Sequence, residues 1–274
     1  MRLFLIPIST RRAFVYCQSP QFRTIGVIDR ITDKAAATWA KWERAEKGWK
    51  KQLVTYGHVI LQRIPYEEWG LKSIPPLNTR QLIEESKRDH PIDVMFPGNA
   101  IKKDQVLSVL RTLGTERQEL DRRKMWWCFG IAPLTAPIAL IPVVPNIPFF
   151  YLVYRGWSHW RALNGSRHLV YLLDHDMAKP HAFTRLEKFY STRLLRGEAQ
   201  GKIALKPGSM PEEPDGRERL LLEKEDGREL GEILEAPGIA IEVERAVLQI
   251  RKKLEAEQQP KKQARSENDE KKNF

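Results

Sequence analysis

Side chains that could bind a metal ion gather between residues 168 and 181. Asp174, His175 and Asp176 are consecutive, and His168 and His181 lie on either side of them. Imidazole and carboxylate groups are ligands that divalent metal ions accept. Because the spacing of these five residues matches no established metal motif, we predict no metal site and no cofactor.

Motifs of enzyme chemistry are also missing from the sequence. It contains no phosphate-binding GxxxxGK[ST] loop, no HExxH zinc motif and no GxSxG nucleophile elbow. The sequence therefore does not predict an enzyme.

The segment Met125–Tyr154 is the most distinctive part of the sequence, since it has 30 residues and no charge. About 20 apolar residues suffice to cross a bilayer, and aromatic side chains collect at membrane interfaces. The predicted interfacial anchors are Trp126, Trp127, Tyr154, Trp157 and Trp160. We therefore predict that the segment lies in a membrane. The alternative is a buried helical hairpin in a domain outside the membrane.

Prolines divide this segment into two arms. Proline lacks a backbone N–H and interrupts a helix. A membrane turn is therefore predicted at Pro142, Pro145, Asn146 and Pro148. Basic flanks lie on both sides of the segment, at Arg122, Arg123, Lys124, Arg155 and Arg161. Because basic flanks prefer the same side of a membrane, a hairpin is favoured over a single kinked span.

Several further segments are expected to surround the hairpin. The first 28 residues hold four arginines and no acid, which suits a cleaved mitochondrial presequence. The arginines do not fall on one helical face, however, so we favour a retained β-hairpin or extended segment, with strands around Leu3–Ile6 and Ala13–Tyr16. The predicted domains are an N-terminal β or extended segment (1–28), a soluble helical region with a Trp-rich amphipathic helix (29–124), the membrane hairpin (125–154), a basic helical region (155–200), a linker (201–232), a C-terminal helix (233–255) and a disordered tail (256–274).

Together these segments predict a mainly α-helical integral membrane protein. It has a short helical hairpin in the membrane, soluble helical flanks and a small N-terminal β or extended element. The net charge of +11 favours anionic partners, meaning lipid headgroups or nucleic acid. The basic residues flank the apolar segment instead of forming one dense stripe, so we expect anionic lipid and no nucleic acid.

Three unusual strings resemble one known family. They are the opening Met1–Arg12, the helix with Trp39 and Trp42, and Pro142–Phe150 leading into Tyr154–Arg161. These strings resemble the fungal mitochondrial K⁺/H⁺ exchange-related proteins, and the likeness covers about residues 1–175. The resemblance implies a mitochondrial inner-membrane protein involved in potassium–proton exchange. It carries over no catalytic or ion-binding residue.

The segment itself argues against a lone exchanger. A proton-coupled cation carrier needs an ionisable side chain at membrane depth, whereas this segment offers only Thr135 and Asn146 as polar side chains. We therefore expect an accessory, regulatory or assembly component of the exchanger. It would have a membrane-protein partner or form a homo-oligomer, and its soluble segments would lie in the matrix. The alternatives are a membrane-anchored scaffold without a transport role and a basic RNA- or ribosome-associated membrane protein.

Overall fold

The computed structural model describes residues 1–18, 63–76, 91–135, 137, 147–201, 203, 216 and 218–272. The chain divides into two compact units, one formed by Met1–Gln18 with Tyr66–Phe274 and the other by Ser19–Pro65. Almost all described residues belong to the first unit. Trp39 and Trp42 of the predicted Trp-rich helix lie outside the described residues, as do Pro142, Pro145 and Asn146 of the predicted turn.

A four-stranded sheet forms the centre of the first unit. Its strands are β1 (Arg2–Pro7), β2 (Ala13–Gln18), β3 (Ile92–Phe96) and β4 (Ala178–Ala182), in the order β2-β1-β3-β4. β1 and β2 are antiparallel, in register from Arg2 opposite Gln18 to Pro7 opposite Ala13, whereas β3 is parallel to both β1 and β4. The two N-terminal strands thus lie where the short apolar runs Leu3–Ile6 and Ala13–Tyr16 predict them. The edge strand β4 accommodates Pro180, as edge strands can.

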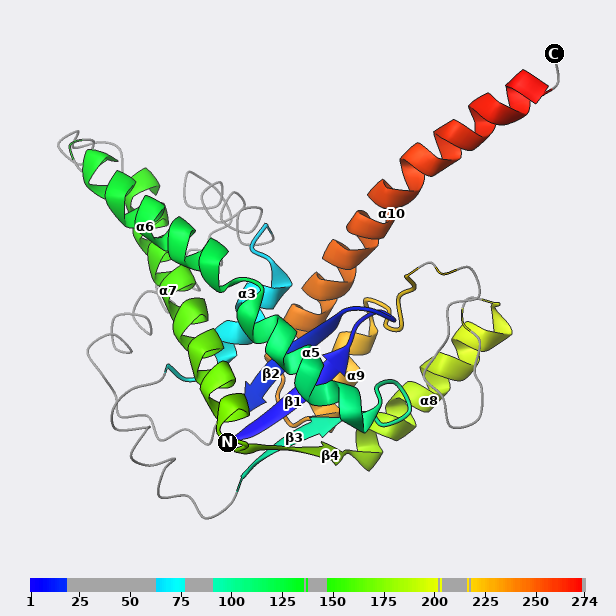
Figure 1. Cartoon of the computed structure of the whole chain (residues 1–274), viewed down its shortest axis with the longest axis horizontal. Coiled ribbons are helices and arrows are strands. Elements are labelled where there is room, and N and C mark those ends of the chain that lie inside the picture. Colours follow the sequence, from blue (N-terminus) through cyan, green and yellow to red (C-terminus); the bar gives the residue numbers. More distant parts are fainter. Residues whose placement is uncertain are drawn as a thin grey trace, which may run out of the picture. The chain divides into compact units, whose positions relative to one another are not determined.

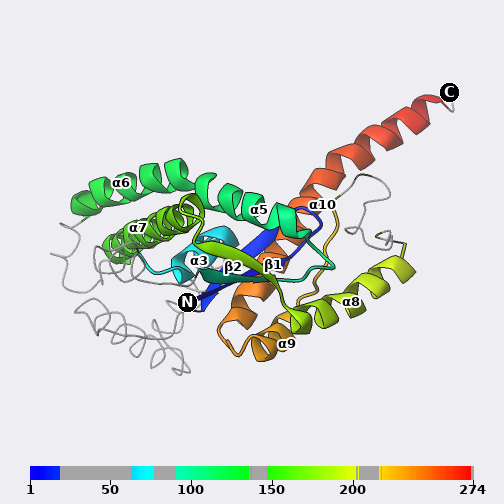
Figure 2. The ribbon, with the colours of Figure 1, turned by 60° about the horizontal axis from the view of Figure 1, so that its bottom comes forward.

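Alternating side chains of the sheet supply two hydrophobic cores. Phe4 and Ile6 join the core formed with α8 (Thr184–Ala199), α9 (Asp226–Ile233) and α10 (Ile239–Lys272). Leu3 and Leu5 join the core formed with α5 (Lys103–Thr115) and α7 (Ile147–Asp174). The helices therefore cover both faces of the sheet, as Figures 1 and 2 show. α6 (Gln118–Thr135) packs on α7, and α3 (Tyr66–Ser73) packs against α7 and β2.

The prediction of a mainly α-helical integral membrane protein is wrong, because the fold is mixed α/β. Within the described part of the chain, no helix combines the length and the apolar character needed to cross a bilayer. The helix boundaries explain the error. The uncharged segment 125–154 ends α6, whose first half is charged, and begins α7, which continues through Arg155, Arg161 and Arg167. Each helix is therefore apolar over only part of its length.

Several regions differ in secondary structure from the sequence-based expectation. Residues 226–233, within the predicted linker, form α9, and the linker's Leu221 N–H donates a hydrogen bond to the carbonyl of Ile8 at 2.9 Å. Strand β3 lies within the predicted helical region 29–124, and strand β4 lies within the predicted basic helical region 155–200. At the other end of the chain, α10 extends to Lys272.

Candidate functional site

A cluster of buried charged side chains lies where α3, α6 and α7 meet. Glu68 on α3 is 0 % exposed, Asp121 on α6 is 1 % exposed and His159 on α7 is 2 % exposed. Charged groups lose hydration when they are buried, so they are almost never buried this far without partners. We call this cluster, completed by Lys72, Arg155 and Ser158, the buried ion network.

Helical spacing brings the members of the network onto facing surfaces. Residues three or four apart lie on one side of a helix. Glu68 and Lys72 therefore share a face of α3, and Arg155, Ser158 and His159 share a face of α7. The two helices pack against each other, which places these faces in contact.

The Arg155 guanidinium is the centre of the network. Its Nη1 donates to Glu68 Oε1 at 2.9 Å, and its Nη2 donates to Glu68 Oε2 at 3.2 Å. Such bidentate charge-assisted pairs are among the stronger hydrogen bonds in proteins. The arginine side chain is only 12 % exposed, so solvent screens this pair little.

Arg155 also determines which nitrogen of His159 carries the proton. Arg155 Nη2 lies 2.9 Å from His159 Nε2, and a guanidinium can only donate. Nε2 must therefore accept, and the neutral ring carries its proton on Nδ1. That proton points to Asp121 Oδ1, which lies 2.9 Å from Nδ1. His159 thus links Arg155 on its own helix to Asp121 on α6.

Lys72 enters the network through Ser158. The ammonium donates to Ser158 Oγ at 3.0 Å, and the Ser158 hydroxyl in turn donates to Glu68 Oε1. The ammonium nitrogen also lies 3.4 Å from the centre of the Trp69 ring, a cation–π contact.

Helix α10 extends this arrangement through Arg245, whose guanidinium lies 4.8 Å from the centre of the Trp69 ring. Arg245 Nη1 pairs with Glu242 Oε2 at 2.8 Å. With His159 neutral, three cations (Lys72, Arg155 and Arg245) balance three anions (Glu68, Asp121 and Glu242).

Two members of the network have pKa values that this environment shifts. Burial alone would raise the pKa of Glu68, but the hydrogen bonds and positive charge of Arg155, together with the hydrogen bond from Ser158, lower it. Burial lowers the pKa of Lys72 to about 8, with nearby Arg155 and Arg245 also lowering it and Glu68 and Glu242 opposing the shift. Lys72 can therefore change its charge near neutral to mildly alkaline pH.

The network also contains the ligand types of a metal site, but its hydrogen bonds oppose metal binding. One ligand atom from each of Glu68, Asp121 and His159 lies within 4.8 Å of the others. Metal binding at His159 Nδ1 would leave the neutral ring's proton on Nε2, where it would face the N–H of Arg155. Arg155 already supplies the positive charge that a metal would bring. We therefore interpret the cluster as an ion network.

The lowered pKa of Glu68 predicts an acid-sensitive contribution to stability. This contribution is present above the unfolded-state pKa of 4.5 and is lost as the pH falls below that value towards the folded pKa. Chemical denaturation of the natural chain and of Glu68→Gln, measured from neutral to acid pH, tests it. The difference between their free energies of unfolding should shrink below about pH 4.5. A difference that stays constant would contradict the assignment.

The structure separates the predicted basic flanks. Arg122, Arg123 and Lys124 are exposed on α6, and Arg161 is partly exposed on α7. Arg155, in contrast, is the centre of the buried ion network. The sequence interpretation missed this network because Arg155 follows an apolar segment, as a membrane flank would. The sequence feature that could have indicated the network is the spacing of Arg155, Ser158 and His159, which places three polar side chains on one helical face.

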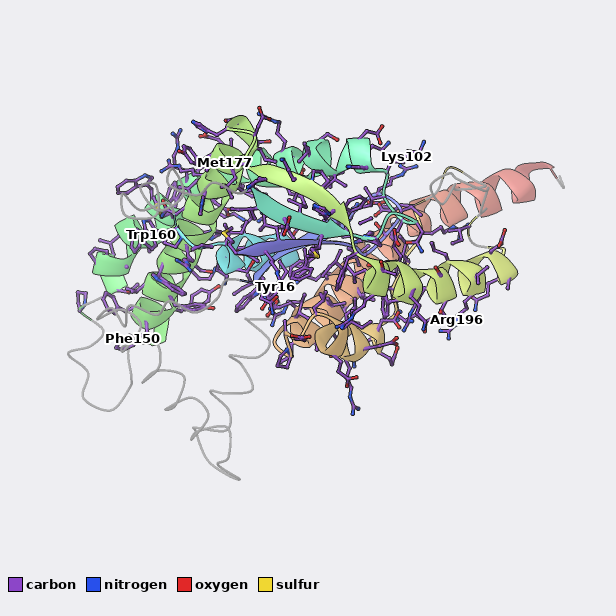
Figure 3. The ribbon with its side chains drawn as sticks, turned by 90° about the horizontal axis from the view of Figure 1, so that it is seen from below. Tyr16, Lys102, Phe150, Trp160, Met177 and Arg196 are labelled. Atoms are coloured by element: carbon purple, nitrogen blue, oxygen red, sulfur yellow. The ribbon has the colours of Figure 1, made fainter. Side chains whose placement is uncertain are left out.

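The predicted interfacial anchors fall into two groups. Trp126, Trp127 and Trp160 are exposed, and Figure 3 shows Trp160 on α7. Tyr154 and Trp157 are half-buried, with ring centres 6.1 Å apart. Pro148 lies in the first turn of α7.

Four of the five possible metal ligands between residues 168 and 181 have separate partners in the structure. Asp174 Oδ1 pairs with Arg111 Nη2 at 2.7 Å, and His168 Nδ1 lies 2.8 Å from the carbonyl of Pro75. His175 packs on Tyr171, with 4.1 Å between the ring centres, and His181 Nε2 lies 3.8 Å from Asp93 Oδ1.

Comparisons with known proteins agree with the resemblance seen in the sequence. Residues 2–173 match the family described as mitochondrial K⁺–H⁺ exchange-related. An uncharacterized protein of Schizosaccharomyces pombe is 28 % identical over 195 residues, which cover 69 % of this chain and 82 % of the relative. An uncharacterized protein of Saccharomyces cerevisiae is 26 % identical over 201 residues, which cover 64 % of this chain and 63 % of the relative. No solved structure matches.

Proposed function

Because the chain belongs to the mitochondrial K⁺–H⁺ exchange-related family, we propose that it is an accessory component that regulates this exchange at the inner membrane. Its described unit lies on the matrix side and acts on a membrane-protein partner that carries the ions. The role requires no enzymatic step and no cofactor. The family name supports the link to mitochondria and to exchange, and the buried ion network supports a regulatory role.

The observation that carries the regulatory role is the position of Lys72. Its ammonium contacts Trp69 and Ser158 and is surrounded by Glu68 on α3, Arg155 on α7, and Glu242 and Arg245 on α10. Loss of the Lys72 proton leaves the network with one net negative charge at the junction of three helices. An exchange reaction that moves protons changes the pH on both sides of its membrane. A buried group that titrates near pH 8 can report such a change to the helices around it.

Potassium-acetate swelling of isolated mitochondria, which reports K⁺–H⁺ exchange, tests this proposal. Mitochondria without the chain should swell more slowly, and the natural chain should restore a rate that changes as the pH crosses about 8. Lys72→Met should restore swelling without that pH response, because methionine fills the same space and cannot titrate. Lys102→Met, at an exposed position, should behave like the natural chain.

Two results would overturn the proposal. Potassium-dependent proton flux from the purified chain alone in liposomes would make it the exchanger and not an accessory. An unchanged pH response in Lys72→Met, with the variant shown to be folded by its thermal unfolding, would remove Lys72 from the regulation.

A further inference from the structure

Large apolar side chains are unusually exposed on α6 and α7. Trp126 and Trp127 are 67 % and 61 % exposed, and Leu134, on the same helix, is 77 % exposed. Phe150, Tyr151 and Trp160 are exposed on α7, and Figure 3 shows Phe150 and Trp160 on this helix, away from the strands. We call these six exposed residues of α6 and α7, five aromatic residues and one leucine, the aromatic face. Exposed apolar patches of this kind mark interaction sites.

The packing of α6 explains why this face is open. Asp121, Met125 and Ala132 are its buried residues, spaced so that they form one stripe towards α7. The ring of Phe129 packs against Gly156, where an added Cβ would lie 2.7 Å from the ring. Only one side of α6 is therefore used for packing within the described unit, and its tryptophans are left on the outer side.

Positive charge borders the aromatic face on α6. Three exposed basic residues, Arg122, Arg123 and Lys124, come shortly before Trp126. Arg122 forms an ion pair with the exposed Glu119. From Arg122 to Leu173 the sequence contains six basic residues and no acid. An anionic surface with an apolar layer beneath it would match both features. A second copy of this chain would place like charges together.

From this complementarity we infer that the aromatic face and its basic border dock on the surface of an anionic phospholipid bilayer. The tryptophan rings would lie at the headgroup level, where amphipathic aromatic rings are favoured. The three basic side chains would approach the lipid phosphates. The contact is made from one side of the bilayer and requires no helix to cross it. The inference goes beyond the proposed regulatory role and does not depend on it.

Flotation of the purified full chain with phospholipid vesicles tests the inference without any exchange reaction. The chain should float with phosphatidylcholine vesicles that contain cardiolipin, should remain behind with phosphatidylcholine alone, and should bind less at high potassium chloride concentration. Trp126→Gln with Trp127→Gln should weaken binding at least about 10-fold. Replacing Arg122, Arg123 and Lys124 with glutamine should weaken it about 100-fold, since each basic residue near an anionic surface contributes about fivefold.

Matched controls lie on other helices. Leu195 on α8 is 61 % exposed and Ile241 on α10 is 63 % exposed, so glutamine at both positions removes similarly exposed apolar side chains outside the face. Glutamine at Lys102, Lys103 and Lys252 removes three exposed charges elsewhere. Both controls should float like the natural chain.

Three results would overturn the inference: equal binding to neutral and anionic vesicles, failure of the natural chain to bind anionic vesicles, or binding by the face variants equal to that of the controls. If the natural chain does not bind vesicles and the tryptophan variant still loses swelling activity in mitochondria, the face docks on a protein instead. The regulatory proposal would survive all three results, because it rests on Lys72.

Discussion

Arg155→Met is expected to lower the free energy of unfolding by about 3–5 kcal/mol, because it leaves a buried carboxylate without its main partner. Glu68 is 0 % exposed, and each of its two carboxylate oxygens accepts a hydrogen bond from the Arg155 guanidinium. The same substitution removes the donor to His159 Nε2. Chemical denaturation followed by circular dichroism measures the loss.

An exposed arginine pair provides the control for this prediction. Arg111 contacts Asp174 at 2.7 Å, but the two side chains are 53 % and 47 % exposed. Arg111→Met should cost no more than about 1 kcal/mol, as is usual for surface ion pairs. The double variant Glu68→Gln with Arg155→Met should be more stable than Arg155→Met alone. Without the Glu68 carboxylate, the loss of Arg155 no longer leaves a buried charge unpaired. Equal losses for Arg155→Met and Arg111→Met would contradict the buried ion network.

Gly165→Ala should reduce the free energy of unfolding by about 3 kcal/mol, the upper end of the usual cost of overpacking, because a clash with fixed backbone cannot be relieved by a side-chain rotation. An alanine Cβ at this position of α7 would lie 2.0 Å from the carbonyl oxygen of Leu71 and 3.2 Å from that of Ile74. The glycine allows α7 to approach the end of α3. The substitution would force these helices apart close to the contacts between Lys72 and Ser158.

Gly130→Ala is the matched control on α6. No atom lies within 4 Å of an added Cβ there, and alanine favours a helix over glycine by about 1 kcal/mol. Thermal unfolding should therefore show a lower Tm for Gly165→Ala and an unchanged or higher Tm for Gly130→Ala. A Tm for Gly165→Ala equal to that of the natural chain would show that α3 and α7 do not approach as closely as described.

The buried ion network, which also includes α3, shares helices α6 and α7 with the aromatic face. Asp121 and Arg155 connect α6 and α7 to the unit's interior, and Trp126 and Phe150 lie exposed on these same helices. A change in the charge of Lys72 would alter its hydrogen bond to Ser158 on α7. If both proposals hold, the pH response and the docking contact share one structural element, which the two experiments examine separately.

The sequence by itself was enough for the features that depend on local pattern. Two short apolar runs around a polar turn placed the strands within residues 2–18, and unusual strings indicated the family. Trp126 and Trp127, two of the predicted interfacial anchors, are exposed, and their place at a membrane interface stays a prediction. The strands and the family were accessible because short apolar runs and motif strings are properties of neighbouring residues.

Only the tertiary structure decided how the uncharged segment is used and where the charges are buried. Hydropathy alone makes residues 125–154 one continuous apolar segment. In the structure, its beginning belongs to α6 and its end to α7, and both helices also carry charged residues. Arg155 and Glu68 are 87 residues apart, and Asp121 and His159 are 38 apart. Whether a charge is buried depends on such distant partners, because only they can replace the water it loses. The pattern of Arg155, Ser158 and His159 on one face of α7 marks one side of the network, but it does not identify the partners on α3 and α6.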